Sequence, residues 1–146
     1  MLRSLFSLGA LLLGSAFLLF AGGMNSLLLP IQCEYYALEG LSVIAHIIKQ
    51  LREGRANPTI DIQGIVMTMY DARTRLSPDV VAEVKSHFGE KVYKTVIPRN
   101  IRLSEAPSFG RPVIQYDPHC TGAIAYRELA KEVIARELAE HPVTVG

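Results

Sequence analysis

Arginines gather in two short segments of this sequence, each of which follows an apolar run. Arg73 and Arg75 follow one run, Arg99 and Arg102 follow the next, and Arg111 comes shortly afterwards. A guanidinium group presents a planar fork of N–H donors that matches the oxygen atoms of a phosphate. The arginines therefore predict a shared anionic site for phosphate or nucleic acid.

A simpler interpretation assigns the same arginines to solvated surface ion pairs. Acidic residues lie close to them in the sequence, at Asp71, Asp79 and Glu105. Exposed ion pairs of this kind are common on soluble proteins and contribute little to stability. The residues alone leave both interpretations open.

Two other patterns that resemble functional motifs are incomplete. Gly9 and Gly14 have the spacing of a phosphate-binding loop, with Ser15 behind them, but the lysine that this loop requires after the second glycine is absent. Cys33 and Cys120 are far apart, without a CxxC pair or a histidine at metal-binding spacing. We therefore predict neither a nucleotide site at the glycines nor a metal site, and we expect both cysteines to be buried thiols.

The segments that carry the arginines must be held by the elements around them. The pattern predicts strands at residues 27–32, 60–70 and 91–98, and helices from about 38 to 51, from a Ser77 N-cap to Phe88, and from about 121 to 140. It predicts an irregular stretch from residue 99 to 122. The last helix has an apolar stripe that consists of Ile124, Leu129, Val133, Ile134 and Leu138.

Alternation of strands and helices is typical of an α/β fold with a parallel sheet and flanking helices. Ligands of such sheets bind beyond the carboxyl ends of the strands. Both arginine segments follow predicted strands, so the fold class favours a site that includes them.

Charge is unevenly distributed along the 146 residues, although the net charge is only +1. Apart from Arg3, no charged residue precedes Glu34, whereas the remainder has an ordinary soluble composition. This pattern excludes a polytopic membrane protein and a strongly basic nucleic-acid domain. It divides the chain into a hydrophobic leader (residues 1–26), a globular part (27–140) and a tail (141–146).

Within the leader, residues 5–21 are almost wholly apolar, and with the uncharged residues that follow them they meet the length that a membrane-spanning helix needs. A cleaved signal peptide and a transmembrane helix are about equally compatible with this stretch. The leader is also similar to the first helix of major-facilitator transporters, which indicates an unrelated segment joined to the globular part.

Four blocks of the globular part resemble the C-terminal half of ParA-type chromosome-partition ATPases, the group that includes Soj. These blocks are PIQCEYYALEGLS (30–42), GIVMTMYDARTRLSPDVVAEV (64–84), KVYKTVIPRNIRLSEAPSFGRPV (91–113) and YDPHCTGAIAYRELAKEV (116–133). The resemblance implies half of a P-loop NTPase with a deviant Walker motif. An intact member binds ATP and magnesium, forms a nucleotide-linked homodimer, associates with nonspecific DNA and works with a ParB-type partner. It also implies a cytoplasmic, nucleoid-associated protein.

The resemblance assigns roles to individual residues. It matches Arg73 and Arg102 to the arginines of the family that contact DNA, and it suggests that Glu105 orients Arg102 or serves the turn. It places the adenine of the nucleotide against Pro98, Arg99 and Asn100, with Met69 as a further candidate.

The catalytic lysines and aspartates of the family precede the first matching block, where this chain has the hydrophobic leader instead. Phosphoryl transfer requires positioned phosphates, magnesium and water. We therefore expect no catalytic residue, no metal ligand and no ATPase activity in this chain alone, which we interpret as a fragment of a partition ATPase. Two alternatives remain: a nucleotide-independent DNA-binding or dominant-negative partner of an intact ParA, and a small domain that is membrane-anchored or secreted through residues 5–21.

Overall fold

The computed structural model describes residues 26–140, which fall into two compact units. The first unit contains residues 26–28 and 39–63, and the second contains residues 29–38 and 64–140. Among the described residues, no helix is both long and apolar enough to cross a membrane. The predicted apolar segment at residues 5–21 and the tail at 141–146 lie outside the described residues. Ser26, which we had placed in the leader, is the first residue of a strand.

Three strands form one sheet in the order β1-β2-β3, where β1 is Ser26–Gln32, β2 is Asp61–Tyr70 and β3 is Val92–Pro98. Strands β2 and β3 run parallel, with Tyr70 opposite Pro98 at their carboxyl ends. The predicted strands and the α/β fold class are thereby confirmed. Burial alternates along β1, where Leu27 and Leu29 are buried and Leu28 is exposed.

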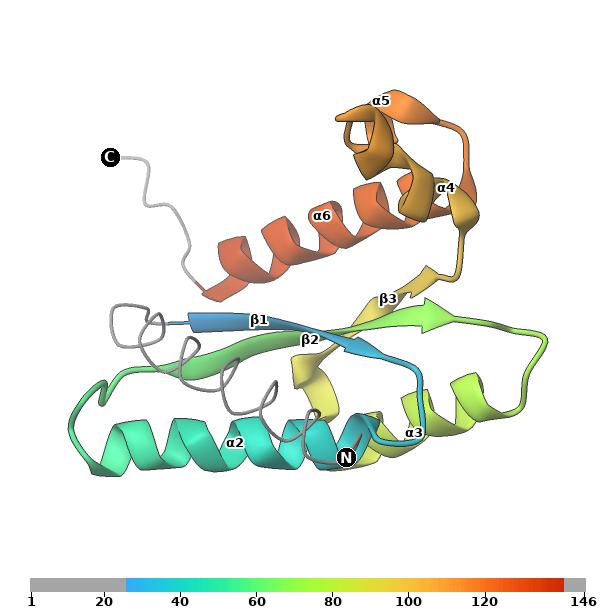
Figure 1. The fold of residues 1–146 in the computed structure, drawn as a ribbon. Coiled ribbons are helices and arrows are strands. Elements are labelled where there is room, and N and C mark those ends of the chain that lie inside the picture. Colours follow the sequence, from blue (N-terminus) through green and yellow to red (C-terminus); the bar gives the residue numbers. More distant parts are fainter. Residues whose placement is uncertain (1–25, 141–146) are drawn as a thin grey trace, which may run out of the picture. The chain divides into compact units, whose positions relative to one another are not determined.

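In the second unit, helix α6 (Thr121–Glu140) packs on β3, and helix α3 (Leu76–Phe88) lies on the other side of the strands (Figure 1). The core beneath α6 consists of Val66, Tyr93, Ile97 and Leu129. Gly64 is required there, because a Cβ atom at this position would overlap the ring of Tyr93. The ring of Tyr93 on β3 therefore leaves no space for a larger residue at position 64 on β2.

Two charged residues of α6 bind the backbone of β3. Glu132 accepts hydrogen bonds from the N–H groups of Lys94 (2.7 Å) and Thr95 (2.9 Å). Arg136 donates to Glu132 (3.0 Å) and to the carbonyl of Val92 (3.1 Å), and its guanidinium lies 4.0 Å from the ring centre of Tyr93. Partial burial acts to raise the pKa of Glu132, but these hydrogen bonds outweigh burial and hold the pKa below its ordinary range.

The stretch from residue 99 to 122 is helical in part, so the prediction of an irregular segment was wrong. It contains α4 (Ile101–Glu105), the 3-10 helix η2 (Ala106–Phe109) and α5 (Val113–Tyr116). Asn100 caps α4 by accepting the N–H of Arg102, and Gly110 ends η2 with a left-handed backbone (φ 62°). Single-turn helices of this length carry no apolar repeat, and for that reason the periodicity gave no signal.

Two further expectations about helices need correction. Ser77 is not the N-cap of α3, which begins at Leu76; the buried Ser77 hydroxyl instead accepts the N–H of Asp71 at 3.1 Å. In α6 only Leu129 of the predicted stripe is buried and Val133 partly so, whereas Ile124, Ile134 and Leu138 are exposed. The buried face of α6 also uses small residues, because Gly122 sits where a Cβ atom would lie 2.7 Å from Leu103.

The first unit contains most of helix α2 (Ala37–Glu53), as the helical spacing predicted. Leu41, Ile48 and Leu51 are buried on this helix. Arg52 connects the helix to the start of β2: its Nε donates to the carbonyl of Ile60 (2.6 Å), and its Nη2 pairs with Asp61 (2.9 Å). The helix and the strand that follows it are thus joined by one arginine.

Candidate functional site

The carboxyl ends of β2 and β3 lie side by side in the second unit. The N–H of Arg99 donates to the carbonyl of Tyr70 at 2.8 Å, which extends the pairing by one residue beyond the strands. The segments that begin at Asp71 and at Arg99 therefore leave the sheet from neighbouring positions. This is the edge at which parallel sheets bind ligands.

Met69 occupies an irregularity of β2 just before this edge. Its φ of 55° lies in the left-handed region that side chains other than glycine rarely adopt. The register of β2 against β3 shifts between Met67 and Tyr70, so one extra residue is accommodated there. Such bulges change the direction of side chains near functional sites.

Pro98, Arg99 and Asn100, the residues predicted to face the adenine, are adjacent at the end of β3. Pro98 is opposite Tyr70, and Arg99 is exposed. Asn100 uses its Oδ1 to accept the N–H of Arg102 (2.8 Å) and its Nδ2 to donate to Thr121 (2.6 Å). The structure thus gives Asn100 a clear role in shaping the loop, and its adenine role stays a prediction.

Arg73 forms a close ion pair with Asp71 in the turn after β2. Its Nε and Nη2 atoms donate to the two carboxylate oxygens at 2.9 and 2.8 Å, while its own backbone N–H donates to Oδ1 at 3.0 Å. These bonds lower the pKa of Asp71 to about 2, with a smaller contribution from the charge of Arg99. The Arg73 side chain remains 85% exposed, so its outer face is open to solvent.

Arg102, on α4, is held by two carboxylates. Its Nη1 donates to Glu105 at 2.9 Å, and its Nε lies 3.4 Å from Asp117. Tyr116 donates its hydroxyl to the same Oε2 of Glu105 at 3.2 Å, and its ring stacks on Phe109. The orienting role suggested for Glu105 has this physical basis, and Asp117 and Tyr116 are partners that our sequence interpretation missed.

Tyr116 and Asp117 start the block that begins YDPHC, but nothing in their spacing relates them to Arg102. They meet it because α4, η2 and α5 fold back on one another (Figure 1).

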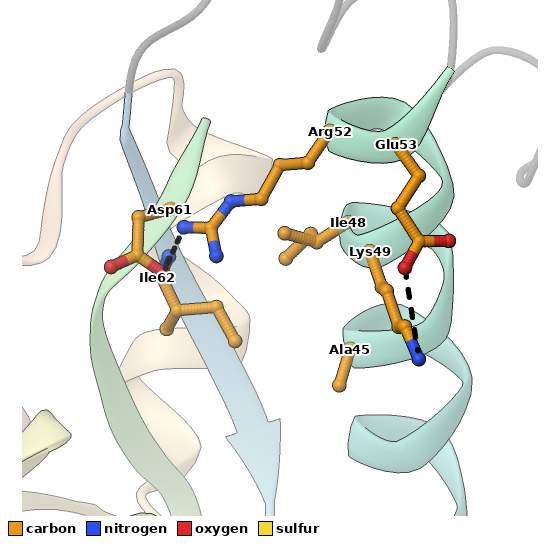
Figure 2. Close-up of a pocket in the computed structure, with 7 residues that line it drawn as sticks. All are labelled: Ala45, Ile48, Lys49, Arg52, Glu53, Asp61 and Ile62. Carbon is orange, nitrogen blue, oxygen red and sulfur yellow. Dashed lines mark hydrogen bonds and ion pairs between the residues drawn. The ribbon is translucent and has the colours of Figure 1, made fainter. Parts of the chain in front are cut away.

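A separate pocket lies in the first unit between α2 and the start of β2 (Figure 2). It has a volume of about 280 Å³ and is lined by Ala45, Ile48, Lys49, Arg52, Glu53, Asp61 and Ile62. Its charged groups pair with one another, as in Arg52–Asp61 and Lys49–Glu53. Its other lining residues, Ala45, Ile48 and Ile62, are apolar.

The two cysteines lie in different environments. Cys33 is buried, as expected, and burial raises its thiol pKa to about 11. Cys120 is only partly buried, contrary to the expectation, and accepts the N–H of Ala123 through its sulfur. Between residues 26 and 140, no group of three or more acidic, cysteine or histidine side chains could hold a metal ion.

The profile of the CobQ/CobB/MinD/ParA nucleotide binding domain family matches residues 13–113, which is more than half of the chain. The chain belongs to this family. Relatives include the chromosome partitioning protein ParA of Caulobacter vibrioides, with 54% identity over 113 residues. The sporulation initiation inhibitor protein Soj of Bacillus subtilis is 54% identical over 111 residues. The resemblance to ParA and Soj that we identified is confirmed.

The chain spans less than half the length of these relatives. The match with Caulobacter ParA covers 77% of this chain and 42% of the relative, and the match with Soj covers 76% and 44%. The arginine segments and the candidate adenine segment therefore belong to the part that this ParA-family chain shares with them. The similarity of the leader to a transporter helix stays a prediction.

Solved structures agree with the CobQ/CobB/MinD/ParA fold. The cobyrinic acid a,c-diamide synthase of Mycobacterium smegmatis, with bound ADP and magnesium, has a TM-score of 0.58 at 26% identity, over 83% of this chain and 41% of that one. A McdA variant from Cyanothece in complex with ATP has a TM-score of 0.62 at 17% identity, over 82% of this chain and 44% of that one. At that identity the second similarity supports the fold alone.

Proposed function

We propose that this chain is the C-terminal part of a ParA-type partition ATPase and that it contributes nonspecific DNA contacts through Arg73 and Arg102. The observation that carries the proposal is the pairing of the two strand ends through the Arg99–Tyr70 hydrogen bond. It brings two arginine-bearing segments to one edge of the sheet. Exposed guanidinium groups at that edge are suited to DNA phosphates, which are read without regard to base sequence.

The strength of this contact is limited by its small number of cations. Each phosphate that a protein neutralises contributes about 0.9 to the slope of log K against log salt, so two arginines per chain give weak, salt-sensitive binding. Summation over several chains would raise the affinity through effective concentration. A homodimer, or assembly with an intact ParA subunit, fits this requirement. We further propose a ParB-type protein as the regulatory partner. The location that goes with these partners is the nucleoid, in the cytoplasm.

For the nucleotide, we propose that Met69, Pro98, Arg99 and Asn100 line the adenine side of an ATP site in the intact family member. The proposal is supported by the left-handed backbone of Met69, near the carboxyl end of β2, and by Asn100, which caps α4 just after β3. Asn100 retains one amide hydrogen and one lone pair for a base, because its other groups bind Arg102 and Thr121.

The sequence has no Gly-Lys-Ser/Thr motif, whose lysine binds the phosphates and whose hydroxyl holds magnesium. We therefore propose that this polypeptide does not hydrolyse ATP by itself. Magnesium-dependent ATP hydrolysis that stays with the chain through every further purification step would contradict this.

The DNA contact is tested by replacing Arg73 and Arg102 with alanine together. We expect the double variant to lose salt-sensitive retention on a nonspecific duplex and the salt slope to fall by up to about 1.8. A matched control replaces Lys49 and Lys131, which are exposed and each paired with a glutamate, and removes the same charge elsewhere. Equal retention of the Arg73/Arg102 variant and the control would contradict the assignment.

A further inference from the structure

The environment of Arg102 is more acidic than a simple DNA-binding arginine would require. Glu105 binds Nη1 and Asp117 lies beside Nε, so two carboxylates share one guanidinium. The cluster of Arg102, Glu105 and Asp117 therefore carries one net negative charge. A phosphate that approaches this cluster meets an attractive group and two repulsive ones.

The carboxylates are held in place by groups other than Arg102. Tyr116 donates its hydroxyl to Oε2 of Glu105, the same oxygen that accepts from Arg102. Tyr116 is itself fixed by the stacked ring of Phe109, with ring centres 4.9 Å apart. Glu105 therefore keeps Tyr116 as a hydrogen-bond donor when Arg102 turns toward another group.

Arg102 nevertheless has donors to spare. Its side chain is 48% exposed, and only Nη1 and Nε have carboxylate partners among the contacts just described. A guanidinium has five N–H groups, so its remaining donors can engage a phosphate. Full engagement, with Nη1 and Nη2 on one phosphate, requires Nη1 to leave Glu105.

We propose that Glu105, supported by Asp117, competes with DNA phosphate for Arg102 and so limits how tightly this chain holds DNA. The inference rests on the proposed DNA contact of Arg102. A built-in competitor keeps the contact of each chain weak, so that binding depends on several chains acting together and reverses readily when they separate. Glu105 is therefore a positioning residue that sets the affinity and not a DNA contact.

The test compares Glu105→Gln with the parent chain in binding to a fluorescent nonspecific DNA duplex over a range of salt concentrations. Glutamine keeps a carbonyl oxygen for the Tyr116 hydroxyl and removes the charge. We expect binding about twofold to fivefold tighter, the range that corresponds to an exposed ion pair. The salt slope should rise by only a fraction of the roughly 0.9 that one phosphate contact contributes, because Arg102 already contacts phosphate in part in the parent chain.

Two controls identify the route of the effect. Glu128→Gln on α6 removes an equal charge from an exposed pair with Lys131, and it should tighten binding much less. In a chain that already carries Arg102→Ala, Glu105→Gln should change DNA affinity no more than Glu128→Gln does, since the competition acts through Arg102.

The outcomes separate the inference from the proposed function. If Arg102→Ala weakens DNA binding but Glu105→Gln leaves it unchanged or weaker, the competition is wrong and the DNA contact stands. Tightening by Glu105→Gln that persists without Arg102 also overturns the competition. If Arg102→Ala has no effect on DNA binding, the proposed contact is wrong, and the inference falls with it.

Discussion

The clamp that Glu132 forms on β3 makes a quantitative prediction about stability. The carboxylate accepts the N–H groups of Lys94 and Thr95 and pairs with Arg136, with all three distances between 2.7 and 3.0 Å. Its side chain is only 18% exposed. Replacement by alanine removes these bonds at once and leaves two backbone donors without their acceptor.

The size of the effect follows from the bonds that are lost. A hydrogen bond to a charged group contributes about 1.5–3 kcal/mol, and an unsatisfied buried donor costs a similar amount. Lys94 is exposed and Thr95 is half-buried, so water replaces part of what is lost. We therefore expect Glu132→Ala to lower the free energy of unfolding by about 2–3 kcal/mol. At about 4 °C per kcal/mol, the melting temperature should fall by roughly 8–12 °C.

The assay is urea and thermal unfolding of the full chain, followed by circular dichroism at neutral pH. Glu128→Ala, on the same helix and paired with the exposed Lys131 at 2.8 Å, provides the matched control and should cost less than about 0.5 kcal/mol. Equal stability of the two variants would refute the clamp.

The clamp also predicts how stability depends on pH. The hydrogen bonds hold the pKa of folded Glu132 below its unfolded value, which is about 4.3 for a free glutamate. The stabilisation is therefore complete above the unfolded pKa and is lost as the pH falls through the lower folded pKa. The difference in stability between the parent and Glu132→Gln should be constant near neutral pH and narrow in acid. A difference that grows in acid would show that the carboxylate is not stabilised by folding.

Two further predictions concern packing and thiol reactivity. Gly64→Ala should destabilise the chain by about 1–3 kcal/mol in the same unfolding assay, because the new Cβ overlaps Tyr93. Gly40→Ala is the control: its new Cβ meets no atom within 4 Å, so it should be neutral or stabilising. A thiol reagent should modify Cys120 well before Cys33 in the folded chain, since burial raises the pKa of the Cys33 thiol to about 11. Equal rates of modification, measured by mass spectrometry, would contradict the burial of Cys33.

The sequence was sufficient to predict the strands and the longer helices. Apolar runs identified all three strands, because a strand in a sheet covered by helices needs apolar residues along most of its length. The location of the arginines after β2 and β3 followed from the positions of these runs in the sequence.

Features that depend on close approach or on short helices could not be predicted in the same way. The buried face of α6 includes Gly122 and Ala123, small residues that carry no apolar signal but allow the helix to approach Leu103. Ser77 had the composition of an N-cap, yet its hydroxyl is used by Asp71 in the preceding turn. The contacts of Glu105 with Tyr116, and of Arg102 with Asp117, span eleven and fifteen residues and arise only when α4, η2 and α5 fold together.

The two register shifts between β2 and β3 act in opposite directions. From Ile65 to Met67 on β2, the partner strand advances from Val92 to Val96, so β3 holds two extra residues; from Met67 to Tyr70 the extra residue is on β2. The two strands therefore reach Tyr70 and Pro98 almost level, within one residue of each other. Deletion of Met69 would remove the extra residue on β2, so the two register shifts would no longer offset each other. The side chains after it would turn to the opposite face of the sheet. The direction in which the chain leaves β2 toward Arg73 thus depends on the number of residues in each strand as much as on their chemistry.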